Sequence, residues 1–312
     1  TTACYLSRKY GLRSAMPMFK AMELCPHAVV IPPNMAKYKA VSKQIRGIFA
    51  DISDSIEPIS LDEAYLDLSM EHRVSDDVPA RALADAASRI EREVGITVSI
   101  GLSYNKFLAK LASDRDKPRG FSVLGRTEAR AYLAMLTVSR IHGVGKSTQQ
   151  RMEAFGFATI ADLQRLPEGQ IIGMFGKFGY RLAQFVQGED DRKVTPDRDT
   201  KSVSAETTFR RDTGELAALV EAVEPMCRRV AERLVRSELA GRSVVLKLKT
   251  TDFRVLTRSS QLRAPTQKAD LLFERAQALL VREAGRTTYR LIGIGVSDLV
   301  PAQEADPPDL FS

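Results

Sequence analysis

Residues 60–68, SLDEAYLDL, place two adjacent carboxylates in the middle of an apolar, strand-forming run. A charged side chain inside such a run needs a partner or a solvated turn. On a straight strand, Asp62 and Glu63 would point to opposite faces and could not serve one site. A turn or bulge at residues 60–63, between strands at 54–59 and 64–69, would bring the two carboxylates together.

Two carboxylates held this close repel each other unless a cation lies between them, and oxygen-only ligation suits Mg²⁺. The pair therefore predicts a cation site. The alternative is a solvated turn between two strands, which is what an isolated Asp-Glu pair usually is. The apolar flanks, among them Ile59 and Leu66, weaken that alternative.

The composition favours a nucleic-acid partner. The chain has 312 residues, with 46 Lys and Arg against 39 Asp and Glu and a net charge of +7. This length suits two or three domains, and a basic balance favours a polyanion. No apolar run is long enough to span a membrane and no signal-peptide pattern opens the chain, so we expect a cytoplasmic protein without membrane contact. The cysteines and histidines are scattered and indicate neither disulfides nor a zinc site.

The first eleven residues, TTACYLSRKYG, combine aromatic and basic side chains. Their pattern predicts the end of a strand entering a turn, and we expect further residues before Thr1. Tyr5 and Arg8 fit either a phosphate site or a surface segment. A short helix after Pro17 and an amphipathic helix ending near Asp51 complete a small helical subdomain.

Strands and helices alternate from the carboxylate pair to residue 124. Periodicity predicts a helix with Leu83 and Ile90 on its apolar face, a strand at 96–102, a helix at 105–113 and a strand at 121–124. This order predicts one α/β layer with the carboxylates at its rim. Lys117 and Arg119 precede the last strand and are expected to reach an anion at that rim, unless their loop is a solvated turn.

From residue 127 onward the pattern is helical. Gly143 and Gly145 lie between two predicted helices, directly before Lys146. The backbone N–H groups of such a turn suit a phosphate and read no bases. A second Gly-rich turn, at residues 173–179, precedes another helix. Two such hairpins predict a clamp on duplex DNA, and the alternative is a pair of ordinary interhelical turns.

Residues 188–200 are almost entirely polar and predict a linker. The following segments read strand, helix, strand, strand, helix, strand, which predicts a split βαβ domain with both helices on one side of one sheet. Lys247 and Lys249 alternate with leucines, so one strand has a basic face. That face fits either the backbone of a nucleic acid or ordinary solvent exposure.

Four motifs, TACYLSRKYGLRSAMP, SLDEAYLDL, NKFLAKLASDRDKPRG and HGVGK, closely resemble the Y-family translesion DNA polymerases. The resemblance extends from Thr1 to about Leu299. It implies an α+β multidomain, right-hand polymerase with a ferredoxin-like palm, small helical fingers, a helix-hairpin-helix thumb and a βαββαβ little finger. The implied divisions are fingers 1–33, palm 34–124, thumb 125–192, linker 193–201, little finger 202–300 and tail 301–312.

The resemblance also implies roles for particular residues. Asp62 matches the second metal-binding aspartate and Glu63 the adjacent catalytic glutamate of a site for two Mg²⁺ ions. Tyr5, Arg8 and Lys117 match contacts to the incoming deoxynucleoside triphosphate, with Thr2 beside them. The residues that we expect to bind primer-template DNA are Gly143, Gly145, Lys146, Gly176, Lys177, Lys201, Lys247 and Lys249.

The sequence departs from the family pattern at both ends. The first metal-binding aspartate of the family, and the aromatic residue that excludes ribonucleotides, lie on an N-terminal strand that this sequence does not contain. If Thr1 were the true start, nucleotide transfer should be severely impaired. His142 stands where the family commonly has Pro. Residues 306–311 resemble the sliding-clamp hexapeptide with Asp306 in place of Gln, so clamp contacts are expected from Asp309, Leu310 and Phe311.

The expected activity is error-prone, template-directed DNA synthesis past damaged bases, by a monomer that also binds the sliding clamp. One alternative is a catalytically inactive relative that acts as a DNA- and clamp-binding scaffold, which would have no need for the carboxylates or the triphosphate contacts. Another is a helix-hairpin-helix repair nuclease, which would leave the fingers segment and the βαββαβ domain unexplained.

Overall fold

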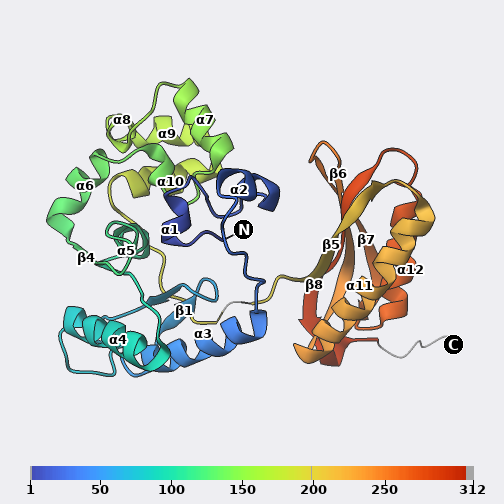
Figure 1. Ribbon diagram of the computed structural model, residues 1–312, viewed down its shortest axis with the longest axis horizontal. Helices are drawn as coiled ribbons and strands as arrows, with labels where there is room; N and C mark the ends of the chain where they lie inside the picture. Colours follow the sequence, from blue (N-terminus) through green and yellow to red (C-terminus); the bar gives the residue numbers. More distant parts are fainter. Residues whose placement is uncertain (1, 198, 307–312) are drawn as a thin grey trace. The chain divides into compact units, whose positions relative to one another are not determined.

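The computed structural model describes residues 2–197 and 199–306, and the chain divides into two compact units, residues 1–197 and 198–312 (Figure 1). Each unit has hydrophobic cores of its own. No helix in the described part of the chain has both the length and the hydropathy needed to cross a membrane.

The second unit has the predicted order of strands and helices. Its elements are β5 (Ser202–Thr213), α11 (Leu216–Arg236), β6 (Leu239–Thr250), β7 (Val255–Thr266), α12 (Ala269–Val281), β8 (Tyr289–Pro301) and the short 3₁₀ helix η2 (Ala302–Glu304). The four strands form one sheet in the order β5-β8-β6-β7, with every neighbouring pair antiparallel. The βαββαβ prediction is confirmed, and β8 fills the gap between β5 and β6, which the split βαβ topology requires.

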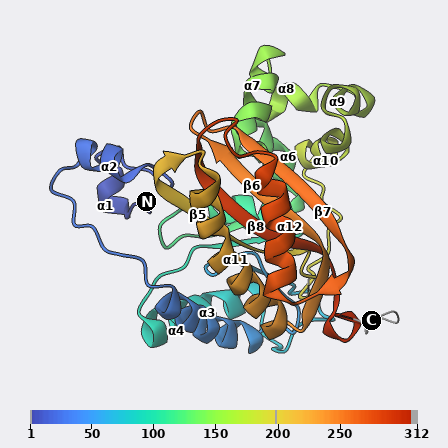
Figure 2. The ribbon, with the colours of Figure 1, turned by 90° about the vertical axis from the view of Figure 1, so that its right-hand side faces the viewer.

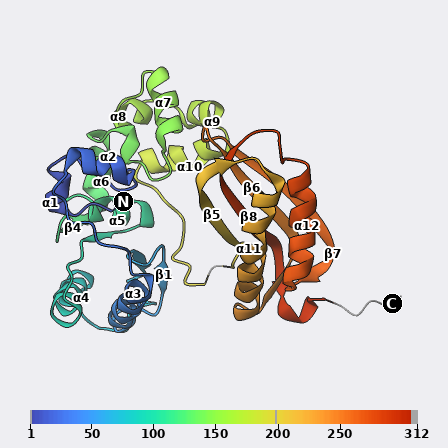
Figure 3. The same ribbon diagram turned by 45° about the vertical axis from the view of Figure 1, so that its right-hand side comes forward.

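Both helices of the second unit lie on the same face of its sheet (Figures 2 and 3). Successive side chains of a strand point to opposite faces. Val244, Leu246 and Leu248 therefore enter the core beneath the helices, whereas the alternating Lys247 and Lys249 lie on the open face.

The N-terminal segment of the first unit is helical, not the end of a strand. It contains α1 (Tyr5–Arg8) and α2 (Met18–Leu24), which surround a small core of Ala3, Leu12, Ala21 and Cys25. The prediction failed because four residues form too short a helix to show a period. The amphipathic helix α3 (Met35–Ala50) then ends at the predicted Asp51, which is its C-cap.

The middle of the first unit contains α3 and β1 (Ile56–Pro58), β2 (Ala64–Leu66), α4 (Pro79–Val94), β3 (Ile100–Ser103), α5 (Lys106–Ser113) and β4 (Phe121–Leu124). The strands form two separate two-stranded sheets, β1-β2 and β3-β4, instead of the single layer expected. Residues 96–99, expected in a strand, have no regular structure. Side chains from both sheets, such as Leu66 and Ile100, nevertheless pack on one core with Ile48 and Ile90.

The remaining helices of the first unit are α6 (Arg126–Ala134), η1 (Val138–Arg140), α7 (Lys146–Ala154), α8 (Ile160–Gln164), α9 (Glu168–Phe175) and α10 (Lys177–Val186). The second glycine turn is shorter than predicted. Gly173 lies within α9 and Gly179 within α10, so the chain turns at Gly176, which has φ +59°. Glycine adopts a positive φ without the steric strain that a Cβ would cause, so this turn favours glycine at position 176.

Helix α5 shares its core with the helices that follow residue 125. The rings of Phe107 on α5 and Phe185 on α10 stack with centroids 4.3 Å apart and an interplanar angle of 5°. Both side chains are almost completely buried. The core therefore continues across the expected palm–thumb division at residues 124 and 125.

We predict that Leu234→Ala destabilises the second unit alone. Leu234 is fully buried on α11, and truncation of a buried leucine costs about 2–5 kcal/mol. The neighbouring Val235 is 58% exposed, so Val235→Ala should change stability by less than about 1 kcal/mol. Differential scanning calorimetry should show one of two transitions moving in Leu234→Ala. A shift of both transitions by the same amount would contradict two separate cores.

Candidate active site

The carboxylate pair lies in a tight β-hairpin. Strands β1 and β2 pair antiparallel, with Ile56 opposite Leu66 and Pro58 opposite Ala64. The backbone N–H groups of Ile59 and Ser60 both donate to the carbonyl oxygen of Glu63, at 2.9 and 3.2 Å. The predicted turn is therefore confirmed, although both strands are shorter than expected.

The two carboxylates lie at the protein surface. Asp62 is exposed, and its Oδ1 accepts a hydrogen bond of 2.6 Å from the Ser60 hydroxyl. The side chain of Glu63 is 38% exposed, and its Oε1 accepts from Lys110 Nζ at 2.7 Å. The turn lifts both carboxylates out of the strand and is exposed to solvent, as in the alternative interpretation, and Glu63 also has a cationic partner.

Lys110 is a positively charged partner of the carboxylate pair, and it was not among the residues predicted for the site. Lys106 and Lys110 are four residues apart in the largely apolar helix α5, so they share one helix face. That spacing was the available signal. The contact itself joins residues 47 positions apart, which periodicity cannot predict.

Lys117 also faces this region, whereas Arg119 does not. Lys117 Nζ pairs with Asp114 at 2.6 Å, and this hydrogen bond raises the lysine pKa, with smaller contributions from the nearby Glu63 and Tyr5. Arg119 instead pairs with Glu91 of α4 at 2.9 Å. The expectation that Arg119 reaches an anion at the carboxylate rim was therefore wrong.

Tyr5 and Arg8 lie together on α1. The guanidinium of Arg8 stacks over the Tyr5 ring, 4.9 Å from its centroid, and Arg8 Nε donates to the carbonyl of Ala3 at 3.0 Å. Thr2 is exposed. Since Tyr5 is close enough to Lys117 to affect its pKa, the structure brings Tyr5, Lys117 and Glu63 into one region.

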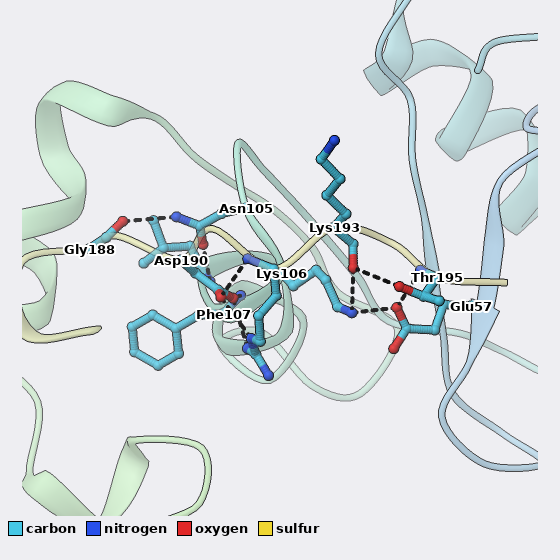
Figure 4. A network of polar contacts seen from close by, with 10 residues as sticks. Glu57, Asn105, Lys106, Phe107, Gly188, Asp190, Lys193 and Thr195 are labelled. Carbon is cyan, nitrogen blue, oxygen red and sulfur yellow. Dashed lines mark hydrogen bonds and ion pairs between the residues drawn. The ribbon is translucent and has the colours of Figure 1, made fainter. Parts of the chain in front are cut away.

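A buried ion pair supports the hairpin. Glu57, on β1, is fully buried and pairs with Lys106, which is 6% exposed (Figure 4). Lys106 Nζ also donates to the carbonyl of Lys193 at 3.0 Å, and the N–H of Thr195 donates to Glu57 Oε2 at 2.8 Å. Local sequence patterns do not reveal this pair, because Glu57 and Lys106 are separated by 49 positions.

Residues 188–195 are hydrogen-bonded to the start of α5 and to β1, contrary to the expectation of a linker. The carbonyl of Gly188 accepts from Asn105 Nδ2 at 2.8 Å and from the Tyr104 hydroxyl at 2.9 Å. Asp190 accepts from the N–H of Phe107 at 2.9 Å. We call residues 188–195 the strap. Its backbone and the Asp190 carboxylate bind the rest of the first unit, so a polar composition did not indicate a free linker here.

The strap also places charges around Tyr65 of β2. Arg192 makes two hydrogen bonds of 2.7 Å to Asp190. Burial raises the pKa of Asp190, but these bonds and the charge of Arg192 outweigh it, so that the pKa lies below its usual value. Lys106 Nζ lies 4.9 Å from the centroid of the Tyr65 ring. Burial raises the pKa of Tyr65 to about 12, although the charge of Arg192 lowers it.

The first glycine turn lies within electrostatic reach of the carboxylate hairpin. Burial lowers the pKa of His142, and the charges of Arg192 and Lys110 lower it further, whereas Glu63 opposes the shift. His142, Glu63 and Lys110 therefore lie close enough for their charges to interact.

The two glycine turns are adjacent to each other. Gly143 has φ +95°, and a Cβ there would lie 3.3 Å from the ring of Phe178 on α10. Gly145 is the N-cap of α7, and Gly176 is the N-cap of α10. Lys146 and Lys177 are the exposed first residues of these two helices. Helix N-termini attract anions, and the lysine at each one adds to that attraction.

The remaining predicted sites belong to the second unit. On the open sheet face, Lys247 pairs with Glu206 at 2.8 Å and Lys249 lies 4.9 Å from the centroid of the Phe253 ring. Lys201 is exposed directly before β5. Asp309, Leu310 and Phe311 lie outside the described residues.

The carboxylate oxygens of Asp62 and Glu63 fit a hard divalent cation such as Mg²⁺. Lys110 binds one oxygen of Glu63, and a carboxylate has a second oxygen for a cation. Within residues 2–197 and 199–306, no group of three or more His, Cys, Asp or Glu is placed to hold a metal ion. These two carboxylates therefore supply part of a cation site.

Comparison with known proteins identifies the family and the fold. Residues 1–114 match the impB/mucB/samB family and residues 200–307 match the C-terminal domain of that family. A structure titled as a Y-family DNA polymerase chimera superposes with a TM-score of 0.84 at 23% identity, covering 95% of this chain and 86% of that one. The fold is therefore that of the Y-family DNA polymerases.

Curated relatives place the chain in one family within the Y-family polymerases. DNA polymerase IV of Brucella melitensis is 52% identical over 310 residues, covering 99% of this chain and 70% of the relative. DNA polymerase IV of Caulobacter vibrioides is 44% identical over 312 residues, covering 100% of this chain and 77% of the relative. The chain belongs to the DNA polymerase IV family.

We predict that Tyr65 is the phenol that titrates near pH 12. Its pKa is raised from 10 to about 12 by burial, so the folded protein keeps the phenol proton after an unfolded chain has lost it. The free energy of unfolding, relative to Tyr65→Phe, should therefore fall as the pH rises from about 10 to about 12. The difference in phenolate absorbance between the two proteins measures this pKa. A difference centred near pH 10 would contradict the burial of the ring.

Proposed function

We propose that this polypeptide catalyses template-directed DNA synthesis past damaged bases, by nucleotidyl transfer at the Asp62–Glu63 turn. The observation that carries the proposal is the arrangement around that turn. Two carboxylates share a tight hairpin, Lys110 lies 2.7 Å from one of them, and Lys117 and Tyr5 lie in the same region. A triphosphate needs cations around its oxygens, and the turn offers both metal-binding oxygens and basic side chains.

In this function, residues 1–33 act as fingers, 34–124 as the palm, 125–192 as the thumb and 202–300 as the little finger. Arg8, Tyr5 and Lys117 bind the triphosphate of the incoming deoxynucleotide, with Thr2 beside them. The glycine turns and their lysines, together with Lys201, Lys247 and Lys249, bind the phosphates of primer-template DNA. Such backbone contacts position a duplex and read no sequence, which suits an enzyme that must copy any template.

Asp62 and Glu63 would hold Mg²⁺, for which we propose two ions. When bound, the ions neutralise phosphate charge and lower the pKa of the attacking primer 3′-hydroxyl. The hydroxyl gives up its proton to a solvent water, its oxygen forms a bond to the α-phosphorus, the bond from that phosphorus to its bridging oxygen breaks, and pyrophosphate leaves. Lys117 and Arg8 offset the charge of that leaving group. The chain thus contributes mainly position and charge.

Asp62→Ala should abolish primer extension and leave DNA binding nearly intact. The aspartate contributes to the site only through its charge and oxygens, so we expect a loss of about 10³-fold or more in kcat/KM. Affinity for DNA comes from phosphate contacts elsewhere, so Kd should change by less than about twofold. Both quantities are measured on the whole polypeptide with a fluorescent primer-template.

The matched control for Asp62→Ala is Asp76→Ala, which removes an exposed carboxylate from the loop between β2 and α4. It should retain full extension. Loss of DNA binding in proportion to extension in Asp62→Ala would contradict this division of roles. Full extension by Asp62→Ala would refute the proposed active site.

We also propose that the C-terminal tail docks on the sliding clamp through Asp309, Leu310 and Phe311. The first residue of the hexapeptide-like segment is held by the second unit, because the Thr266 hydroxyl donates to Asp306 Oδ1 at 2.6 Å and the N–H of Asp306 donates to the carbonyl of Pro265 at 2.8 Å. In the proposed docking, Leu310 and Phe311 enter an apolar pocket of the clamp.

Deletion of residues 307–312 tests this docking and keeps the contacts of Asp306. Extension on a bare primer-template should be unchanged, whereas the stimulation given by a loaded clamp should be lost. Leu310→Ala combined with Phe311→Ala is the conservative version of the same change. Equal extension by the wild-type and deleted forms with the clamp present would count against the tail as a docking peptide.

A further inference from the structure

The strap begins just after helix α10 and reaches β1 of the carboxylate hairpin, where Thr195 binds Glu57. Gly188 and Asp190 bind the start of α5 through Asn105 and Phe107. Further along the chain, Lys193 and Thr195 bind the Lys106–Glu57 pair (Figure 4). Every one of these contacts reaches either β1 or the first turn of α5. The strap therefore holds two elements together that are far apart in sequence.

Helix α5 connects the strap to the candidate active site. It has eight residues, Lys106–Ser113, and its N-cap is Asn105, whose side chain accepts from the N–H of Leu108 and donates to the strap. Lys110 follows Lys106 by one turn, about 6 Å along the axis. A short helix moves as one piece, so a shift of its first turn also moves Lys110 away from Glu63.

The Glu57–Lys106 pair is the part of this connection most sensitive to change. Glu57 is 0% exposed and Lys106 is 6% exposed, and together they accept from and donate to the strap backbone. Charges this deeply buried are held in one geometry, because each loses its hydration and must satisfy its hydrogen bonds inside the protein.

We propose that Glu57 and Lys106 are positioning residues for nucleotidyl transfer. They fasten the strap to α5 and β1, and in this way keep Lys110 against Glu63 at the carboxylate turn. Neither side chain touches the substrate. The inference rests on the proposed function, but its structural part, the dependence of Lys110 on the strap, can be measured without any catalysis.

The test compares Glu57→Met, Lys106→Met and the double variant carrying both. Each single variant leaves one buried charge unpaired and should lose both thermal stability and activity. The double variant removes both charges of the pair and should regain most of the stability, but residues 193–195 of its strap stay unfastened because Thr195 has lost its acceptor and the Lys193 carbonyl its donor. We expect its kcat to remain at least about tenfold below wild type, with KM for the nucleotide and Kd for DNA within about twofold.

A matched control lies in the second unit. Glu283 is 4% exposed and accepts from Arg258 Nε at 2.8 Å, so Glu283→Met disturbs a second buried carboxylate without touching the strap. This variant should lose stability and keep its kcat. Recovery of kcat together with stability in the double variant, or an equal loss of kcat in Glu283→Met, would overturn the positioning role.

Two readouts do not depend on activity. In the double variant, the amide hydrogens of Phe107 and Thr195 should exchange at least about tenfold faster than in the wild type, because their acceptors move or are removed. Lys110 should also react faster with an amine-directed reagent once it leaves Glu63. Unchanged exchange and unchanged Lys110 reactivity would overturn the inference. The same changes in a wild-type protein that extends no primer would support the coupling and refute only the proposed function.

Discussion

The buried ion pair between Glu57 and Lys106 is the contact on which the arrangement of the first unit depends. It unites a strand of the carboxylate hairpin, the first turn of α5 and the backbone of the strap. Removing one partner of such a pair typically costs about 3–5 kcal/mol, because the other charge remains buried and unpaired. The pair therefore favours one geometry strongly over its alternatives.

That geometry explains how an exposed site can be held in place. Asp62 and Glu63 lie at the surface, where a large polyanionic substrate can reach them. A turn at the surface has few contacts of its own, and a site that is one ångström too loose loses much of its rate. Here the Glu57–Lys106 pair fixes β1 against α5. Lys110 of α5 in turn binds Glu63 and so fixes the carboxylate turn relative to the helix.

Local patterns in the sequence predicted the elements that local physics determines. The alternation of apolar and charged residues located the hairpin, and the periods of 2 and 3.6 located the βαββαβ unit. The open sheet face with Lys247 and Lys249 followed from the same alternation. Motifs with a resemblance to a known family placed Asp62, Glu63, Tyr5 and Lys117 in one region before any geometry was available.

The rest depended on contacts between distant residues. Lys110 reaches Glu63 across 47 positions, and Lys106 reaches Glu57 across 49, so no periodic pattern contains either pair. Residues 188–195 looked like a linker because polar residues usually face water, but Asp190 binds the first turn of a helix instead. The prediction that Arg119 reaches an anion at the carboxylate rim failed for the same reason. A basic loop residue can pair with any nearby acid, and Arg119 pairs with Glu91.

The central claim is that the Asp62–Glu63 turn is a metal-dependent active site, and that α5 fixes its position through Lys110. A crystal structure of the whole polypeptide with primer-template DNA, an unreactive nucleotide analogue and Mn²⁺ tests it most directly, because anomalous scattering locates the ions. The account predicts Mn²⁺ on oxygens of Asp62 and Glu63, with Lys110 still bound to the other oxygen of Glu63. Ions bound away from these carboxylates, or Lys110 pointing away from Glu63 while the strap remains in place, would contradict it.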